Sequence, residues 1–297
     1  MKKIIFIIII VSIVAVVGAH FFKPSSSAPA AQRMQVVASG YVPYTLANQI
    51  AGGQAQVSML LPPNAEPHAF EPTPGDMVTV HKAAVFVYVS DELEPWAKDV
   101  LGAAGKGTRV VQLAEGLPQS DDPHVWMDFA NVLLMARKLA GALAQADPQH
   151  APVYQENLDH FEEELSALNN DFSHALADCK SREVVHVGHL AFSALAKRYN
   201  LKLSALAGTS HDGEHAARKL ADLVKYIRAR NVQVVFTEEA VSPRLAQTVA
   251  VETGASLLPL YTIEHVSKDD FNKNVSYAEL MRRNLENLKQ GLSCQAL

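Results

Sequence analysis

The chain has 297 residues, with 26 lysine and arginine side chains against 31 aspartate and glutamate side chains, and a formal net charge of -5 at pH 7. This balance argues against a nucleic-acid-binding protein, because such proteins cluster lysine and arginine to neutralise phosphates. The length is sufficient for one large domain or two ordinary ones.

The first thirty residues differ in composition from the rest. Two lysines precede an apolar run at 4–19, which is the pattern of a secretory signal, and an Ala-x-Ala cleavage pattern follows at Ala28 and Ala30. No cysteine follows the apolar run, so we expect no lipid attachment there. We expect 1–30 to be either a cleaved signal peptide or an N-terminal membrane anchor, and the protein to be periplasmic or extracytoplasmic.

The remaining sequence alternates short runs rich in strand-forming residues with helical periodicity, and the first four of these runs are dense in valine. Runs that are apolar on both faces are typical of parallel strands covered by helices. The expected strands are 34–39, 55–61, 84–90, 108–114, 183–188, 201–207, 232–238 and 255–261. The expected helices are 43–51, 75–82, 94–104, one that begins near Asn131, one around 220–227 and one at 276–292. This order predicts an α/β fold with two lobes, each containing a roughly four-stranded parallel sheet flanked by helices.

One long helix is predicted between the two halves. The segment 147–178 has no glycine, and its apolar residues recur every three or four positions from Leu158 to Leu176. This spacing predicts an amphipathic helix of about 25–30 residues. We expect it to be a rigid connector between an N-terminal lobe (33–146) and a C-terminal lobe (179–297), with loops at the strand ends lining a cleft.

Two cysteines, Cys179 and Cys294, lie at the two ends of the expected second lobe. Disulfides persist in the oxidising compartments to which a signal peptide directs a protein. We therefore expect these two residues to form a disulfide bond.

Most of the twelve histidines have ordinary interpretations. We expect His81, His150, His160 and His174 to lie on solvated helix faces, and leave His265, in a polar loop, without an assignment. Three others, His68, His124 and His189, each follow a predicted strand, which places them at the binding crevice of an open α/β sheet. Imidazole nitrogen suits zinc, and zinc takes about four ligands. Four acids near these histidines are candidates to orient their rings: Glu66, Glu71, Asp122 and Asp128.

The stretch at 73–76, Thr-Pro-Gly-Asp, has a separate structural interpretation as a helix start, with Thr73 as the N-cap and Asp76 three residues later. A second histidine pair, His211 and His215, lacks the continuous helical His-Glu-x-x-His pattern of zinc proteases because Gly213 interrupts it. We expect no enzymatic site there, while an accessory metal contact stays open. Nucleophile-elbow, phosphate-loop and dinucleotide-binding motifs are also absent from the sequence, so the protein is not expected to be an enzyme.

Five ordered blocks of sequence carry a family resemblance. They are NAEPHAFEPTPGDM (64–77), DPHVWMD (122–128), HLAFSALAKRYNL (189–201), a long block from 212 to 255 and YAELMRRNLENLKQGL (277–292). Together they resemble the periplasmic zinc- and manganese-binding solute-binding proteins of ABC importers, of the zinc-uptake type, over about residues 35–292.

The resemblance implies metal capture between two lobes and delivery to a membrane permease with its cytoplasmic ATPase, by a protein that we expect to be a monomer. It implies His68, His124 and His189 as ligands, and histidine rather than glutamate at the third position favours Zn2+ as the transported ion. The aspartate that is usual as the fourth ligand aligns with Tyr261, so Glu239, Glu264 or water remain alternatives.

Two further departures from the family pattern accompany the missing aspartate. The loop at 115–122 is short, acidic and without histidine, so no accessory metal-gathering loop is expected, and histidines stand where proline is usual around 211–215. Alternative functions are uptake of Mn2+ or Fe2+, a zinc hydrolase with Glu239 as general base, and a surface adhesin, for which the sequence has no supporting repeat.

Overall fold

The computed structural model describes residues 33–118, 120–207, 216–238 and 243–295, and the predicted signal or anchor segment at 1–30 lies outside them. Residues 34–297 form one compact unit. Among the described residues, none of the helices combines the length and the apolar composition needed to span a membrane.

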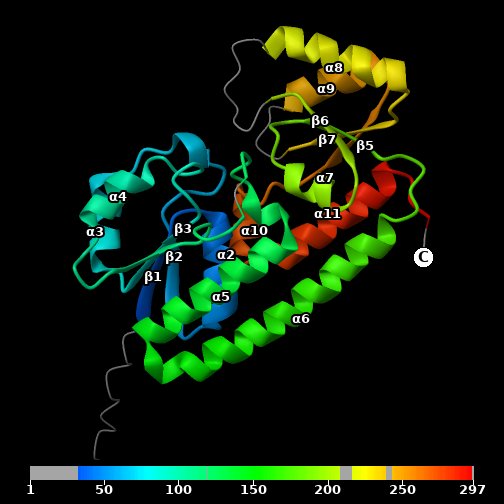
Figure 1. The fold of residues 1–297 in the computed structure, drawn as a ribbon. Helices are drawn as coiled ribbons and strands as arrows, with labels where there is room; N and C mark the ends of the chain where they lie inside the picture. Colours follow the sequence, from blue (N-terminus) through cyan, green and yellow to red (C-terminus); the bar gives the residue numbers. More distant parts are fainter. Residues whose placement is uncertain (1–32, 119, 208–215, 239–242, 296–297) are drawn as a thin grey trace, which may run out of the picture. The chain divides into compact units, whose positions relative to one another are not determined.

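The compact unit contains two four-stranded sheets, in which all neighbouring strands run parallel. The first has the order β2-β1-β3-β4 and the second the order β6-β5-β7-β8, so the same arrangement occurs twice (Figure 1). The strands are β1 (Met34–Ala38), β2 (Ala55–Met59), β3 (Val85–Tyr88), β4 (Arg109–Gln112), β5 (Glu183–Val187), β6 (Lys202–Ala205), β7 (Val234–Thr237) and β8 (Ser256–Pro259). All eight predicted strands are confirmed.

The strand order defines where a ligand can bind. In each sheet the chain first places a strand on one side of the initial strand and then crosses to the other side, so β1 meets β3 and β5 meets β7 at the points where the order reverses. In open α/β sheets the binding crevice lies outside the carboxyl ends of the strands at such a switch point. The expected binding crevice therefore lies over the carboxyl ends of β1, β3, β5 and β7, where loops from neighbouring strands also reach it.

Helices cover both faces of each sheet. They are α2 (Tyr41–Ala51), α3 (Pro74–Lys82), α4 (Ala97–Ala103), α5 (Phe129–Ala146), α6 (Ala151–Ala175), α7 (Ser193–Arg198), α8 (Ala216–Arg230), α9 (Pro243–Thr253), α10 (Lys268–Asn272) and α11 (Tyr277–Gly291), with short 3-10 turns η1 (Pro67–Ala69), η2 (Val125–Met127) and η3 (Pro148–His150). The helix start predicted at Thr73 is confirmed as a complete capping box with Asp76. The short helices α9 and α10 were not predicted.

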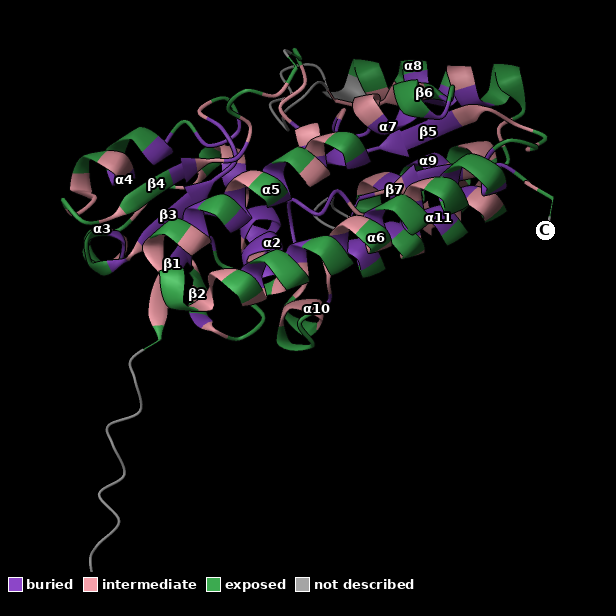
Figure 2. Ribbon diagram, turned by 60° about the horizontal axis from the view of Figure 1, so that its bottom comes forward, coloured by how far each residue is buried: buried purple, intermediate pink, exposed green. Residues whose placement is uncertain are grey.

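The apolar core follows this layering (Figure 2). One cluster lies between the first sheet and helices α3 and α4, where Phe86 packs near Val80 and Val100. A second lies between the second sheet and helices α8 and α9. The largest cluster is continuous across both halves and includes residues of α2, α5, α6 and α11, so the two halves share one core rather than meeting only through a linker.

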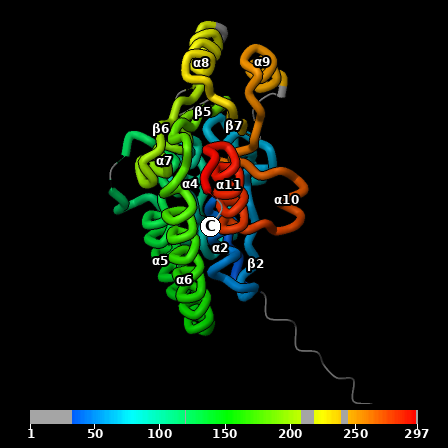
Figure 3. Tube along the Cα trace, turned by 90° about the vertical axis from the view of Figure 1, so that its right-hand side faces the viewer, coloured from blue at the N-terminus to red at the C-terminus, as the bar shows by residue number. Residues whose placement is uncertain are grey.

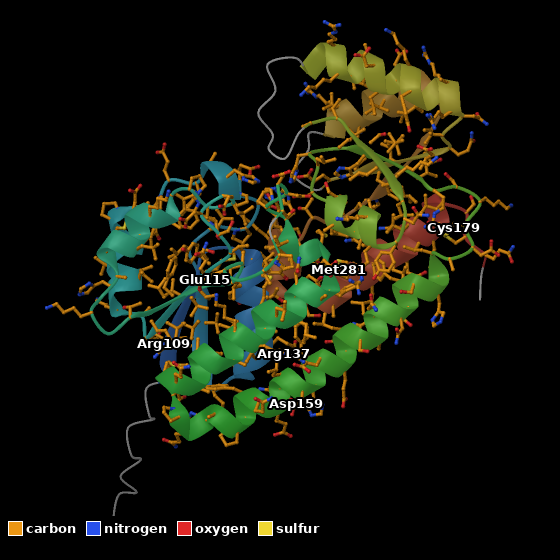
Figure 4. The ribbon with its side chains drawn as sticks, viewed as in Figure 1. Arg109, Glu115, Arg137, Asp159, Cys179 and Met281 are labelled. Atoms are coloured by element: carbon orange, nitrogen blue, oxygen red, sulfur yellow. A yellow bond between two sulfur atoms is a disulfide. The ribbon has the colours of Figure 1, made fainter. Side chains whose placement is uncertain are left out.

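Helix α6 is the predicted long helix, with 25 residues and a buried stripe from Tyr154 to Ala175. It packs against α2 and α5 of the first half and against α11 of the second (Figures 1 and 3). Near its C-terminal end the fully buried Phe172 stacks on Tyr199 and meets Phe129 edge to face, which joins elements from both halves. A bidentate ion pair between Arg137 and Glu162 links α5 to α6, and Figure 4 labels Arg137 on α5.

The predicted disulfide bond is present. Cys179 and Cys294 are joined across 115 residues of sequence, and they also form an isolated antiparallel bridge of the backbone. The bond connects the segment after α6 to the segment after α11, at the end of α6 where Figure 4 labels Cys179. It closes the second half of the chain into a covalent loop.

Candidate metal centre

Four side chains from four separate segments converge at the carboxyl ends of the strands. His68 follows β2, His124 follows β4, His189 follows β5 and Glu264 follows β8. Each presents one ligand atom, and these four atoms all lie within 4.8 Å of one another. His124, His189 and Glu264 are buried, whereas the side chain of His68 keeps 15% of its surface exposed. His68 is therefore the outermost member of the cluster.

The loop that carries His68 is fixed by contacts on both sides. The side chain of Glu66 accepts a hydrogen bond from the backbone N–H of His68 at 3.2 Å and caps η1. On the other side, the indole Nε1 of Trp96 donates to the carbonyl of Pro67 at 2.8 Å. Further back, the backbone N–H of Asn64 donates to the carbonyl of Val266, so this first-half loop is tied to the segment that carries Glu264.

His124 is held by a carboxylate and by an aromatic neighbour. Asp122 Oδ1 lies 2.6 Å from His124 Nδ1 and also accepts the backbone N–H of His124 at 3.0 Å. Two residues later, Trp126 Nε1 donates to the carbonyl of Thr262 at 2.8 Å, which connects this loop to the Glu264 segment. Because Nδ1 of His124 faces a carboxylate, its Nε2 atom is directed into the cluster as a ligand.

His189 is oriented in the same way by Glu238, which directly follows β7. The Glu238 Oε2 atom lies 2.9 Å from His189 Nδ1 and accepts the backbone N–H of His189 at 3.1 Å. The preceding residue must be small, because a Cβ atom at Gly188 would lie 2.3 Å from Glu238 Oε2 and 2.5 Å from the ring of His186. His189 and Glu238 thus occupy the switch point between β5 and β7.

The four ligand atoms lie nearly as far apart as the ligand atoms around a small divalent ion. His124 Nε2 and His189 Nε2 lie 2.9 Å apart, and Glu264 Oε2 lies 3.0 Å and 3.1 Å from them. His68 Nε2 lies 3.4 Å from Glu264 Oε1. A tetrahedral zinc ion with bonds of about 2.1 Å holds its ligand atoms about 3.4 Å apart. Two imidazole nitrogens 2.9 Å apart require either a proton or a metal ion between them.

The pKa shifts of the cluster residues also indicate a site for a cation. Burial opposes a positive charge on His189, but its contacts with Glu238 and Glu264 outweigh burial and raise its pKa to about 10. Burial also opposes charging of His124, and the contacts with Asp122 and Glu264 nevertheless raise its pKa. Burial would raise the pKa of Glu264, yet His124 and His189 hold it well below its usual value. Histidine binds a metal only when neutral, so a divalent ion displaces these protons and takes over their charge-compensating role.

Two buried atoms of the cluster make no hydrogen bond within the described part of the chain. They are His68 Nε2 and Glu264 Oε1. Buried polar atoms in native proteins are almost always paired, and an ion is one of the standard explanations for an exception. Both atoms belong to the group of four, so the donor set of three imidazoles and one carboxylate fits a bound zinc ion.

The structure shows which of the four candidate acids contact the histidine ligands. Asp122 contacts a histidine ring as predicted, and Glu66 contacts the backbone of His68 rather than its ring. The predictions for the other two are wrong: Glu71 is exposed, and Asp128 caps α5 and pairs with Arg198 instead.

For the fourth ligand position, Tyr261 lies outside the group of four and pairs its backbone with Asn284, while Glu264 supplies the carboxylate. Glu239 and the pair His211 and His215 lie outside the described residues. His265, which the sequence left unassigned, is buried next to the cluster.

Sequence reasoning missed Glu238. The signal was available, since this glutamate directly follows a buried strand in the same way as the predicted histidine ligands follow theirs. His81, His160 and His174 are exposed on helices as predicted, and His150 is half-buried beside Asp147.

A pair of α/β halves with a buried three-histidine, one-carboxylate cluster at the carboxyl ends of their strands defines a metal-binding protein of the two-lobe solute-binding class. The chain belongs to the family of the zinc-uptake complex component A, periplasmic, whose model matches residues 36–291. The predicted family is therefore confirmed. This family is defined by zinc uptake and not by catalysis, which confirms that the protein is not an enzyme.

Individual relatives agree with this assignment. The chain is 31% identical to the high-affinity zinc uptake system protein ZnuA of Bacillus subtilis, over 88% of both chains. It is 28% identical to the zinc-binding protein AdcA of Streptococcus pyogenes, of which it spans 61%. A Streptococcus pneumoniae relative is described as a zinc-binding lipoprotein.

Solved structures show the same fold. The metal-dependent lipoprotein YcdH of Bacillus subtilis aligns with a TM-score of 0.78 and 31% identity, over 88% of this chain and all of that one. The laminin-binding protein of Streptococcus agalactiae, described as bifunctional with adhesin and metal transporting activity, aligns with a TM-score of 0.80 and 31% identity, over 87% of this chain and 99% of that one.

Proposed function

We propose that this protein captures Zn2+ through His68, His124, His189 and Glu264, and delivers it to the permease of an ABC importer that is driven by a cytoplasmic ATPase. The observation that carries the ligand assignment is the convergence of three imidazole Nε2 atoms and one carboxylate at ligand spacing in a buried site. Family membership supports the transport role.

The proposed choice of zinc over manganese or ferrous iron follows from the donors. Three nitrogen ligands and a single carboxylate suit zinc, whereas manganese favours sites dominated by oxygen. The carboxylates Asp122 and Glu238 behind two of the imidazoles orient the rings and raise their basicity. Such partners typically change metal affinity by about 10–100-fold when they are removed.

We also propose that residues 33–146 and 179–297 act as two lobes, joined by the connector at 147–178, in a monomeric protein exported by its N-terminal segment. The ligands would then come from both lobes, with His68 and His124 from the first and His189 and Glu264 from the second. The shared core and the cross-lobe hydrogen bonds, such as that from Trp126 to Thr262, support small shifts rather than wide opening during capture.

The experiment compares metal-dependent stability in the wild type and in a double variant, His68→Ala with His189→Ala. Zinc is expected to raise the melting temperature of the wild type, because a ligand that binds only the folded state stabilises it by mass action. The double variant should lose that rise, and His160→Ala, which alters an exposed histidine on α6, should keep it. An equal rise in the double variant would refute the site assignment. Equilibrium dialysis against a mixture of zinc, manganese and ferrous ions tests the choice of metal.

A further inference from the structure

A second group of polar side chains lies directly beside the zinc cluster and shares Glu264 with it. His265 Nε2 lies 3.6 Å from Glu264 Oε1, 3.7 Å from Glu238 Oε1 and 3.8 Å from Glu66 Oε2. The side chains of His265, Glu238 and Glu264 are at most 3% exposed, whereas Glu66 keeps 32% of its surface exposed. The ligand atoms of Glu66, Glu264 and His265 lie within 4.8 Å of one another.

The ring of His265 is oriented so that its Nε2 atom faces these carboxylates. Its Nδ1 atom lies 3.0 Å from the carbonyl oxygen of Ala65. A carbonyl oxygen only accepts hydrogen bonds, so Nδ1 carries a proton and Nε2 is directed at Glu66, Glu238 and Glu264. This contact joins the loop before His68 to the segment after β8, and both segments are therefore fixed around the group.

The spacing suits a metal ion better than hydrogen bonds. Separations of 3.6–3.8 Å between His265 Nε2 and the three carboxylate oxygens exceed the range of about 2.7–3.2 Å for hydrogen bonds from nitrogen to oxygen. A divalent ion with bonds of about 2.0–2.2 Å places ligand atoms on different sides of it about 3.3–3.8 Å apart. One nitrogen and several carboxylate oxygens form a donor set that zinc and related divalent ions accept.

The two oxygens of Glu264 face different neighbours. Oε2 contacts His124 and His189 in the zinc cluster, whereas Oε1 is turned toward His68 and His265. Glu264 is almost completely buried, yet its Oε1 atom makes no hydrogen bond to any described residue. This oxygen lies between a histidine of the inner cluster and His265, so the carboxylate is placed to bridge two ions.

Charge balance agrees with a second ion. Four carboxylates surround the combined clusters: Asp122 and Glu238 behind the imidazoles, Glu264 between the clusters and Glu66 at the outer edge. Carboxylates gathered this closely produce a negative field that attracts cations. The ion-pair partners of Glu264 within the described residues are all histidines, which a second divalent ion can replace as counter-charge.

We propose that Glu66, Glu264 and His265 form a second divalent-cation site, which is bordered by Glu238, shares Glu264 with the zinc cluster and stages the ion on its way in. The partly exposed Glu66 marks the outer end of this route, and a shift of the ion from Oε1 to Oε2 of Glu264 passes it to the inner ligands. The staging role rests on the proposed zinc capture at the inner cluster, whereas the second site itself rests on the distances above.

The test counts metal ions in the full chain by native mass spectrometry and by equilibrium dialysis with zinc. The wild type is expected to hold two ions at saturating zinc, the second more weakly. Glu66→Gln and His265→Gln should each reduce the count to one, while the affinity of the inner site falls by less than the roughly 10–100-fold that is typical when a partner orienting a ligand ring is removed. Glu66→Gln suits this purpose because glutamine keeps an oxygen that accepts the N–H of His68. His160→Gln, on an exposed helix face, is the matched control and should leave the count at two.

Cobalt distinguishes a bridged pair from an ion bound elsewhere. Two cobalt ions joined by the Glu264 carboxylate couple their spins, so the second equivalent should suppress the electron paramagnetic resonance signal of the first instead of doubling it. A single ion in the wild type, an unchanged count in both glutamine variants, or a doubled uncoupled signal would each overturn the second site. Loss of all metal binding in the wild type would instead overturn the proposed capture function, so the two failures are distinguishable.

Discussion

A buried carboxyl at the switch point of the first sheet offers a quantitative prediction about stability. Glu94 is 1% exposed, and its carboxylate accepts hydrogen bonds from the backbone N–H groups of Val89 at 2.7 Å and Ser90 at 3.2 Å and from the hydroxyl of Ser39. Burial favours the neutral form and outweighs these hydrogen bonds, so it raises the pKa of Glu94 to about 7 from an ordinary 4.5. The folded state therefore binds a proton more tightly than the unfolded state between these two values.

The sign of the effect follows from proton linkage. For an acid whose pKa is higher in the folded state, the stabilisation is complete below the unfolded pKa and is lost as the pH rises toward the folded pKa. A difference of about 2.5 units corresponds to about 3 kcal/mol between pH 4.5 and pH 8, at 1.36 kcal/mol per unit. Glu94→Gln keeps the shape and an acceptor oxygen but cannot titrate, so its stability relative to wild type should improve by that amount across this range.

The assay is urea unfolding of both proteins at a series of pH values, in the presence of a chelator so that metal binding does not contribute. The difference in the free energy of unfolding between variant and wild type removes the contributions of all other titrating groups. Glu92→Gln, at an exposed carboxyl two residues away, is the matched control. Parallel stability profiles for Glu94→Gln and wild type from pH 4.5 to pH 8 would show that the reasoning about burial is wrong.

Three other predictions concern the core, the disulfide and the metal. Phe172→Ala should lower the free energy of unfolding by about 3–5 kcal/mol, since it empties a fully buried site that joins both halves, and a loss below about 1 kcal/mol in urea would contradict that role. Replacing both Cys179 and Cys294 by serine should cost about 2–5 kcal/mol, and denaturation curves that match the oxidised wild type would argue against a stabilising bond. Zinc at about 1,000 times its dissociation constant should stabilise the wild type by about 4 kcal/mol in calorimetry, and His124→Ala should abolish most of this gain. Retention of the full gain in that variant would exclude His124 as a ligand.

Much of the fold is readable from the sequence because its signals are local. Parallel strands covered by helices favour apolar, β-branched runs, and all eight predicted runs form strands. The long helix shows its buried stripe over 25 residues, so its periodicity is unambiguous. Helix α10 has only five residues and therefore no readable helical period, whereas α9 was missed although Pro243 stands at its first position, where proline is favoured.

The candidate site is only partly readable for a physical reason. His68, His124 and His189 were found because each follows a strand, and strand ends meet at one edge of a sheet. Glu264 could not be selected over other candidates, because its place beside them depends on the path of the segment after β8. The family alignment pointed to Tyr261, whose backbone is instead paired with a side chain of α11.

The contacts around His265 join segments that are even farther apart in the sequence. Its ring meets the carbonyl of Ala65, 200 residues earlier in the chain. No local pattern reports such a contact, and the sequence accordingly gave His265 no role. Glu238 is the opposite case, because its position directly after a buried strand made it predictable by the same criterion as the histidines.

The most direct test of the account is a crystal structure of the protein loaded with one equivalent of zinc, with diffraction recorded on both sides of the zinc absorption edge. We predict one strong anomalous peak about 2.0–2.2 Å from the Nε2 atoms of His68, His124 and His189 and from a carboxylate oxygen of Glu264. A strong peak elsewhere, with none among these four side chains, would contradict the account.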